Sequence, residues 1–441
     1  MALMLVIADD LTGAADCGVV CAGHGLHTIV VLGDSGGEAN AQVLAVDGDT
    51  RRLQPHEAAA ETARLVRKHL RNEETVFYKK LDSTLRGNVG TELAAALEAR
   101  RSLAGTNERI VAVLAPAFPA TGRTTLNGRQ HIHGTPLEES GPSQDERIPA
   151  RSDIAGLLRE ANLRPALLRL DLLRRELPRG GSGALRDAMK AMAQNADVLV
   201  CDAETGEDLR RIADASMVLG RGTVWAGSAG LASHLPPAAG LTHDSVNSQG
   251  RQLAAGPALF VVGSGSAISR EQVEVLASRS DTIVLRIPPE VLMAGDQSPE
   301  WRAYGLELER AFSEGSDAAI LPGPGVRLDS SMGVVLSAAL AALVRPLAGK
   351  VGALVATGGE TARAVFEAWG VNRLRLIGEV EAGLPFSVTS GWSRELPVLT
   401  KAGGFGGPET LLRCRQFLRG LERGEAAHPR HSNSGPGKGL Q

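Results

Sequence analysis

Two adjacent carboxylates, Asp9 and Asp10, follow an unbroken apolar run over residues 3–7. Continuous apolar residues are typical of a strand buried on both faces of a parallel sheet, and ligands of such sheets bind beyond the carboxyl ends of the strands. Neighbouring carboxylates repel each other, which favours a site that holds a cation, a proton or a polar ligand. The alternative is that one of them caps the helix that begins near Thr12. The two roles are compatible.

A second polar segment, KKLDSTLRGNVG, begins where the strand expected at 75–79 ends. Lys80 and Arg86 can bind a carboxylate or a phosphate, arginine in bidentate fashion. The side chains that can bind ligand hydroxyls are Asp82, Ser83, Thr84 and Asn88. The alternative is a solvated loop in which Ser83 or Thr84 caps the next helix.

Arginine recurs at two more expected strand ends. Arg51 follows the strand expected at 42–46, and Arg123 lies in the segment PAFPATGRTT after the strand expected at 110–114. The carboxyl ends of parallel strands meet at one edge of a sheet. The four polar strand ends therefore predict a pocket for a small anionic polyol.

Three glycine-rich segments follow expected strands in the second half of the chain: VGSGS from Val262, ATGGET from Ala356 and KAGGFGG from Lys401. Glycine lets the backbone approach a ligand closely, and the amides at a helix N-terminus attract anions. A capping box at 269–272 is expected to start the helix after the first segment. One such turn is more often a plain strand-to-helix connection, but three at one sheet edge favour a polyphosphate site.

The common nucleotide and hydrolase signatures do not fit the sequence. No G-x-x-x-x-G-K-[ST] segment occurs, which excludes a P-loop enzyme. Ile268 stands where a dinucleotide fingerprint needs Gly or Ala, which disfavours a Rossmann dehydrogenase. The segment WAGSAGL resembles a nucleophile elbow around Ser228, but the histidines after it lie either too close or in the C-terminal tail. Ser228 is expected to shape a turn instead.

Charge and composition argue against a nucleic-acid or membrane partner. The net charge is −3 without a strongly basic block, and aromatic residues make up 3% of the chain, so neither phosphate-backbone binding nor base stacking is expected. No apolar run reaches the roughly 18 residues of a membrane span, and no signal-peptide pattern occurs. We therefore expect a cytoplasmic protein. The four cysteines lack metal-ligand spacing, and the ligand is expected to be a small molecule.

The elements that must position these groups alternate between apolar strands and amphipathic helices, which is typical of an α/β fold. We expect domains at 1–240 and 258–424, a linker at 241–257 and a disordered tail at 425–441. Residues 122–152 lack this alternation and are predicted to be an ordered excursion. Further strands are expected at 28–32, 196–201, 222–225, 258–262, 282–285, 318–321, 352–356 and 374–377.

Taken together, these segments resemble the four-carbon acid sugar kinase family. The resemblance spans nearly the whole chain and follows the family's order: IADDLTGAAD, KKLDSTLRGNVG, APAFPATGRTT, WAGSAGLA, VGSGS, ATGGET, GEVEAGLPFS and KAGGFGG. It implies two α/β domains with mainly parallel sheets flanked by helices. The N-terminal domain would bind the sugar acid, the C-terminal domain the nucleotide, and the active site would lie in the interdomain cleft.

Membership implies ATP-dependent phosphorylation of the terminal hydroxyl of a tetronate-type sugar acid, with Mg²⁺ bridging the phosphates. The form KKLDSTLRGNVG is closer to the D-threonate kinase branch, and D-erythronate and 3-oxotetronate kinases are the alternatives. A homodimer is expected from base rates. The rival from another class is a non-catalytic sugar-acid sensor.

The resemblance also assigns residues. For the sugar acid it points to Asp10, Arg51, Lys80, Asp82, Ser83 and Thr84. For ATP it points to Ser264, Ser266, Thr357, Gly358, Gly359, Glu360, Gly403 and Gly404.

From these assignments we hypothesise that Arg51 and Lys80 hold the substrate carboxylate while Asp10, Asp82 and Ser83 bind its hydroxyls. Asp10 or Asp9 is the candidate to orient or deprotonate the attacking hydroxyl, with Asp82 as the alternative. One of the two adjacent carboxylates is expected to cap the helix, and the other, Asp10, is expected to face the substrate. No metal ligand is assigned.

Overall fold

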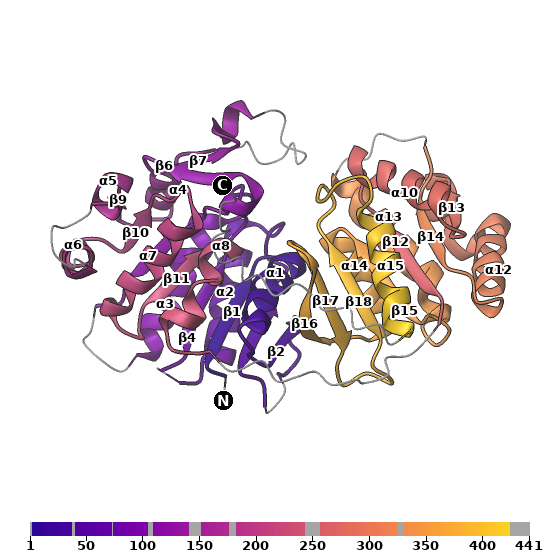
Figure 1. Cartoon of the computed structure of the whole chain (residues 1–441), viewed down its shortest axis with the longest axis horizontal. Helices are drawn as coiled ribbons and strands as arrows, with labels where there is room; N and C mark the ends of the chain where they lie inside the picture. The colour runs from indigo at the N-terminus through magenta and orange to yellow at the C-terminus, as the bar shows by residue number, and fades with distance from the viewer. Residues whose placement is uncertain are drawn as a thin grey trace, which may run out of the picture. The chain divides into compact units, whose positions relative to one another are not determined.

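A computed structural model describes residues 2–37, 40–72, 74–104, 109–140, 151–175, 182–242, 256–324 and 330–423. The chain forms two compact units, Met1–Ser245 and Val246–Gln441 (Figure 1). Most of the expected linker and all of the expected disordered tail lie outside the described residues. The predicted fold class is confirmed, because each unit is an α/β structure built on a mainly parallel sheet.

The first unit is built on a parallel sheet in the order β2-β3-β1-β4-β11-β5-β10-β9. The strands are β1 (Met4–Ala8), β2 (Thr28–Leu32), β3 (Val43–Asp47), β4 (Val76–Lys80), β5 (Ala112–Ala115), β9 (Pro165–Leu168), β10 (Val198–Cys201) and β11 (Val224–Gly227). Every residue of β1 to β4 is buried, as the mainly apolar character of these strands predicts for a sheet covered on both faces.

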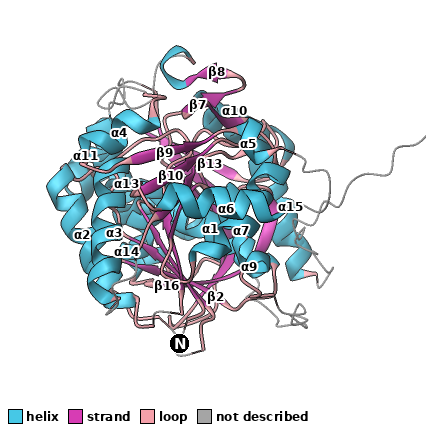
Figure 2. Cartoon of the chain, turned by 90° about the vertical axis from the view of Figure 1, so that its left-hand side faces the viewer, coloured by secondary structure: helices cyan, strands magenta, loops and turns pink. Residues whose placement is uncertain are grey.

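Helices cover both faces of this sheet, and Figure 2 shows them on either side of the strands. On one face lie α2 (Pro55–His69), α3 (Val89–Leu103) and α4 (Ile154–Glu160). On the other lie α1 (Leu11–Gly23), α7 (Gly206–Ser216), α8 (Ala229–Ala232) and α9 (Leu235–Ala238). The short α5 (Leu170–Leu173) and α6 (Ser182–Ala193) precede β10. The core beneath α2 and α3 joins their apolar faces to residues such as Ile7 and Phe77.

The excursion predicted at 122–152 is ordered where the structure describes it. It forms a small antiparallel sheet of β6 (Arg123–Leu126), β7 (Arg129–Ile132) and β8 (Thr135–Pro136). Residues 141–150 lie outside the described part. Strand β9 was not predicted from the sequence, because it is a short edge strand that begins with a proline.

The second unit has its sheet in the order β13-β14-β12-β15-β18-β17-β16. The strands are β12 (Ala258–Val262), β13 (Ile283–Ile287), β14 (Ala318–Pro322), β15 (Ala353–Thr357), β16 (Arg373–Glu381), β17 (Leu384–Thr389) and β18 (Pro397–Lys401). Strand β17 runs antiparallel to both of its neighbours.

The helices of this unit are α10 (Ala267–Arg279), α11 (Pro289–Ala294), α12 (Pro299–Ser313), α13 (Ser330–Val344), α14 (Gly359–Trp369) and α15 (Thr410–Glu422). Its core packs the buried sides of α10 and α15 against Phe260, Val355 and Leu399 of the central strands.

No helix in the described ranges is long and apolar enough to cross a membrane.

Candidate functional site

The polar strand ends of the first unit meet because β1 lies between β3 and β4. Ala8 of β1 pairs with Asp47 on one side and with Lys80 on the other. The residues just beyond these positions therefore lie at one edge of the sheet, which is where parallel α/β sheets bind ligands. The structure brings together the sugar-acid residues that the sequence predicted at the ends of these three strands.

Arg51 is the centre of this cluster. Its Nε donates to Asp9 Oδ2 at 2.7 Å and its Nη2 to Asp9 Oδ1 at 3.1 Å. Its Nη1 donates to Asp10 Oδ2 at 2.6 Å, and Asp82 Oδ1 lies 3.7 Å from Nη2. Burial would raise the pKa of Asp9, but the charges of Arg51 and Lys80 and the hydrogen bonds from Arg51 lower it overall. The guanidinium of Arg51 thus bridges the two adjacent carboxylates and offsets their repulsion.

The division of roles predicted for the pair is wrong in one respect, because Asp10, which was expected to face the substrate while its neighbour capped the helix, is itself the cap. It is the N-cap of α1, and its Oδ1 accepts from the backbone N–H of Gly13 at 2.8 Å. Its other oxygen is held by Arg51. The Asp10 side chain is 21% exposed, whereas that of Asp9 is 3% exposed. Of the two, Asp10 is therefore the carboxylate that a ligand can reach.

Lys80 lies on the α1 side of β4 with its side chain nearly buried. A Cβ atom added at Gly13 would lie 2.7 Å from Lys80 Nζ and 2.7 Å from Asp10 Oδ1. Burial would lower the pKa of Lys80, but the charges of Asp9 and Asp10 raise it overall. Within the described residues, the ammonium group makes no direct hydrogen bond or ion pair. An anionic ligand beside this ammonium would offset part of the cost of burying its charge.

Asp82 is a fixed carboxylate. Arg86 binds it in bidentate fashion, with both N···O distances at 2.8 Å, and the hydroxyl and backbone N–H of Thr84 also donate to it. Burial would raise the pKa of Asp82, but the charges of Arg86 and Arg51 hold it well below its usual range. The backbone carbonyl of Ser83 accepts from Gln130 Nε2 at 2.7 Å, which ties the loop to β7.

Arg123, at the start of β6, completes the cationic side of the cluster. Its guanidinium interacts electrostatically with Asp82 and Arg86, and burial lowers its pKa. It donates to the carbonyl of Thr121. Its Nε is buried without a hydrogen-bond partner among the described residues, so an anion nearby would offset part of the cost of burying this charge.

Two polar residues of the same segment have structural roles. The side chain of Asn88 donates to the backbone carbonyls of Thr50 and Leu53 and so ties two loops together, rather than serving a ligand hydroxyl. Lys79 points to the opposite face of the sheet from Lys80 and forms a buried ion pair with Glu92 at 2.7 Å. No spacing in the sequence predicts this pair, because its two residues lie on a strand and on a helix that meet only in the folded chain.

Ser228 does not belong to a hydrolase site. Its hydroxyl donates to the carbonyl of Ala117 at 2.7 Å and accepts from the N–H of Gly230 at 3.0 Å. It is buried as the N-cap of α8. The structure confirms that this serine shapes a turn.

The three glycine turns of the second unit lie side by side. Val262 at the end of β12 pairs with Thr357 at the end of β15, and Thr357 pairs with Lys401 at the end of β18. The backbone N–H of Gly358 donates to the carbonyl of Lys401 at 2.7 Å. The prediction that these turns meet at one sheet edge is confirmed.

Ser264, Ser266 and Gly403 contact one another between the first and third turns. Ser264 Oγ accepts from the N–H of Ser266 at 3.2 Å, and Ser266 Oγ donates to the carbonyl of Gly403 at 2.8 Å. A Cβ at Gly403 would collide with Ser264 Oγ. The predicted capping box at 269–272 is wrong, because α10 begins one turn earlier with Ser266 as its N-cap. Ser269 instead donates its hydroxyl to Gly403 at 2.6 Å.

The middle turn contains the other predicted nucleotide residues. Gly358 directly precedes α14 and has a φ angle of +100°, which residues with a side chain rarely adopt. Gly359 and Glu360 lie at the start of helix α14. Gly404 lies in the glycine turn that follows β18. The hydroxyl of Thr357 is buried and has no hydrogen-bond partner within the described part of the chain.

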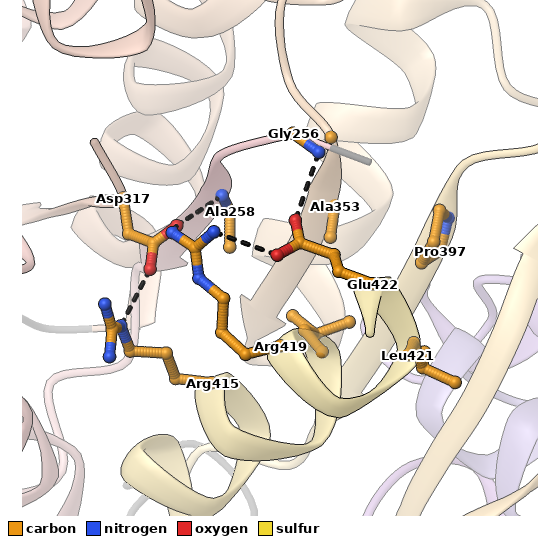
Figure 3. Close-up of a pocket in the computed structure, with 11 residues that line it drawn as sticks. Gly256, Ala258, Asp317, Ala353, Pro397, Arg415, Arg419, Leu421 and Glu422 are labelled. Carbon is orange, nitrogen blue, oxygen red and sulfur yellow. Dashed lines mark hydrogen bonds and ion pairs between the residues drawn. The ribbon is translucent and has the colours of Figure 1, made fainter. Parts of the chain in front are cut away.

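A separate pocket in the second unit lies at the opposite edge of the sheet, near the amino ends of β12, β14 and β15 (Figure 3). Its charged groups neutralise one another. Asp317 binds Arg415 at 2.7 Å and Arg419 at 2.8 Å, and Glu422 binds Arg419 and the N–H of Gly256. This network fixes α15 to the sheet, and each charged side chain that lines the pocket is already paired with one of opposite charge. The glycine turns are therefore the candidate nucleotide site.

The described residues contain no group of three or more His, Cys, Asp or Glu side chains that could hold a metal ion. The cysteines at 17, 21, 201 and 414 are free and buried.

Comparisons with known proteins match both units of the chain. Residues 4–235 match the family description "Sugar-binding N-terminal domain", and residues 259–411 match "Nucleotide-binding C-terminal domain". The chain belongs to the four-carbon acid sugar kinase family.

Relatives and solved structures match the chain over nearly its whole length. It is 39% identical to a D-threonate kinase of Cupriavidus necator, over 94% of this chain and 97% of the relative. A D-threonate kinase of Bordetella bronchiseptica is 33% identical over the same shares. A 3-oxo-tetronate kinase of Methylobacterium radiotolerans is 30% identical, over 93% of this chain and 98% of the relative. A solved structure of a Salmonella typhimurium protein has the same fold, with a TM-score of 0.72 at 22% identity over 94% and 98% of the two chains.

Proposed function

We propose that the protein is an ATP-dependent kinase that phosphorylates the terminal 4-hydroxyl of a four-carbon sugar acid, with D-threonate as its substrate. The observation that carries this proposal is the similarity, at 39% identity over 94% of the chain, to a relative named D-threonate kinase. The cluster of acidic and basic strand ends in the first unit suits a small hydroxy acid, since it offers both a cation and several hydrogen-bond acceptors.

Lys80 is the group we assign to the substrate carboxylate, because its ammonium has no direct partner among the described residues. Arg51, which the sequence predicted to share the carboxylate, uses three N–H groups on Asp9 and Asp10. Two of the five N–H groups of an arginine remain for a ligand. The main role of Arg51 is thus to orient the two aspartates, and its contact with the substrate carboxylate is secondary.

Asp10 is the group we assign to the attacking hydroxyl. It is more exposed than Asp9, and Asp82 is held by the bidentate contact with Arg86. In the proposed step, Asp10 accepts the proton of the 4-hydroxyl as that oxygen bonds to the γ-phosphorus, and the bond between the γ-phosphorus and ADP breaks. Such transfers depend mainly on positioning and charge neutralisation. The hydroxyls of Ser83 and Thr84 and the Asp82 carboxylate are assigned to the remaining substrate hydroxyls.

ATP is assigned to the glycine turns of the second unit, at Ser264, Ser266, Thr357, Gly358, Gly359, Glu360, Gly403 and Gly404. Mg²⁺ keeps several waters and takes one or two carboxylates beside phosphate oxygens. Bound to the triphosphate, Mg²⁺ would supply neutralisation of phosphate charge.

The test is a coupled ADP-release assay with Mg-ATP and a panel of D-threonate, D-erythronate and 3-oxotetronates. We expect the highest kcat/KM with D-threonate and a product with a phosphomonoester at C4, as read by ³¹P NMR. A higher kcat/KM with D-erythronate or a 3-oxotetronate would move the substrate to another branch of the family. Binding of D-threonate without ADP release would indicate a sensor.

A homodimer also stays a prediction, and analytical ultracentrifugation would test it.

A further inference from the structure

Lys401 is a buried lysine at the end of β18, next to the third glycine turn, and it is 1% exposed. Its Nζ donates to the backbone carbonyls of Ala402 at 2.9 Å, Phe405 at 3.0 Å and Gly403 at 3.2 Å. Three acceptors require three N–H groups, which an ammonium has and a neutral amine lacks. The geometry therefore fits the charged form of the side chain.

Other side chains bind two of these carbonyl groups and one more carbonyl of the same turn. Ser266 and Ser269 both donate to the carbonyl of Gly403. Gln272 donates to the carbonyls of Phe405 at 3.0 Å and Gly407 at 2.9 Å. The carbonyl oxygens of the turn are thus gathered by donors from β18 and α10.

The orientation of the carbonyls fixes the orientation of the amides. In a trans peptide, the C=O of one residue and the N–H of the next point in opposite directions, and the structure has no cis peptide bond among its described residues. The N–H groups of Gly403, Gly404 and Gly406 therefore point away from Lys401. They have no acceptor in the described part of the chain. Neighbouring N–H groups without a protein acceptor can bind an anion.

We propose that Lys401 is a positioning residue for the nucleotide: by binding the carbonyls of Ala402, Gly403 and Phe405, it presents the amides of the residues that follow each of them to the phosphates. The inference rests on the proposed function, because it takes ATP as the ligand of these turns. Lys401 itself does not contact the nucleotide. Its positive charge behind the turn adds to the attraction of the amide dipoles for an anion.

The charge of Lys401 is sensitive to pH. Burial lowers the pKa of Lys401 to about 8, although Cys414 and Glu381 act in the opposite direction. Of the groups that face it, Glu381 is bound by Thr410 and Arg413, and burial raises the pKa of Cys414 to about 12, so the thiol is neutral at pH 8. Loss of the Lys401 proton would remove one of the three hydrogen bonds to the turn.

The experiment measures Mg-ATP affinity by calorimetry on the full-length chain and its Lys401→Met and Lys401→Gln variants. We expect the Kd for Mg-ATP to rise about tenfold in Lys401→Met and less in Lys401→Gln, which keeps two donors. The KM for ATP should rise in parallel while the KM for D-threonate stays within about twofold. Lys350→Met, which removes an exposed lysine paired with Glu309, is the matched control and should bind Mg-ATP as the unchanged chain does.

A pH series on the unchanged chain tests the inference without any variant, in case Lys401→Met does not fold. The Kd for Mg-ATP should rise as the pH passes about 8, and the rise should be absent from a folded Lys401→Met chain. A Kd that is constant from pH 7 to about 9.5, or a folded Lys401→Met chain with unchanged affinity, would overturn the role of Lys401. Failure of the unchanged chain to bind Mg-ATP at pH 7 would instead overturn the proposed nucleotide function.

Discussion

Lys79 and Lys80 are neighbours in β4, yet their ammonium groups lie on opposite faces of the sheet. Lys79 is fully buried and pairs with Glu92 of α3 at 2.7 Å. Lys80 lies beside Gly13 and Asp10 under α1. Alternation of side chains along a strand separates the two. One lysine therefore belongs to the core and the other to the candidate site.

Exchange of Lys79 for methionine should mainly reduce stability, whereas exchange of Lys80 for methionine should mainly reduce catalytic activity. Lys79→Met leaves Glu92 buried without its cation, and we expect a loss of about 3–5 kcal/mol in the free energy of unfolding. Lys80→Met removes no direct hydrogen bond or ion pair among the described residues, so it should cost less stability than Lys79→Met, and it should reduce kcat/KM for D-threonate at least about a hundredfold. Urea unfolding and the ADP-release assay measure the two effects. Normal turnover in Lys80→Met would remove Lys80 from the substrate site, and Glu92→Leu should restore part of the stability of Lys79→Met.

Asp10→Asn tests the assignment of the base. Asparagine is also a good N-cap, so α1 should keep its start and the free energy of unfolding should change little. If Asp10 accepts the hydroxyl proton, kcat should fall at least about a hundredfold. The change should appear in kcat rather than in the KM for ATP. Near-normal kcat in a folded Asp10→Asn chain would move the role to another carboxylate.

Gly13→Ala probes the space between α1 and β4. A methyl group there would lie 2.7 Å from both Asp10 Oδ1 and Lys80 Nζ, so the two groups must shift. Misplacement on this scale should reduce kcat/KM about a hundredfold. The matched control is Gly333→Ala in α13, where the added Cβ meets nothing within 4 Å and helix propensity should add up to about 1 kcal/mol of stability. Equal activity of both variants would contradict a substrate site at Gly13.

At low pH, the dependence of the free energy of unfolding on pH should reflect the protonation of Asp9 and Asp82. Their pKa values are lowered in the folded chain, Asp82 well below its usual range. A carboxyl with a lowered folded pKa stabilises the protein above its unfolded pKa, about 3.9, and this contribution is lost as the pH falls through the folded pKa. The free energy of unfolding should therefore decrease below about pH 4. Asp82→Asn should flatten this decrease in urea titrations, and an unchanged slope would contradict the assignment.

Thr357→Val separates nucleotide binding from stability. The Thr357 hydroxyl is buried without a hydrogen-bond partner in the described residues. Its removal should leave the free energy of unfolding unchanged or slightly higher, because an unpaired buried hydroxyl is itself costly. If the hydroxyl binds ATP, the Kd for Mg-ATP should rise about tenfold. An unchanged Kd would remove Thr357 from the nucleotide site.

The sequence by itself located most strands and the polar segments that follow them. Strands β2 and β12 coincide with the predicted ranges, and β1 is shifted by one residue. Continuous apolar runs are a strong local signal for buried strands, and a run that ends in Asp9-Asp10 or in a glycine turn marks the ligand edge of a sheet.

Only the tertiary structure decided which charges are paired. The contact of Arg51 with Asp9 requires β3 to lie next to β1, and strand order is a long-range property that residue spacing does not encode. Long-range packing likewise pairs Lys79 with Glu92. It also leads Ser269 to donate to the carbonyl of Gly403 instead of capping the start of α10. Local patterns place groups along the chain, whereas burial and neighbouring strands determine which of them stay free for a ligand.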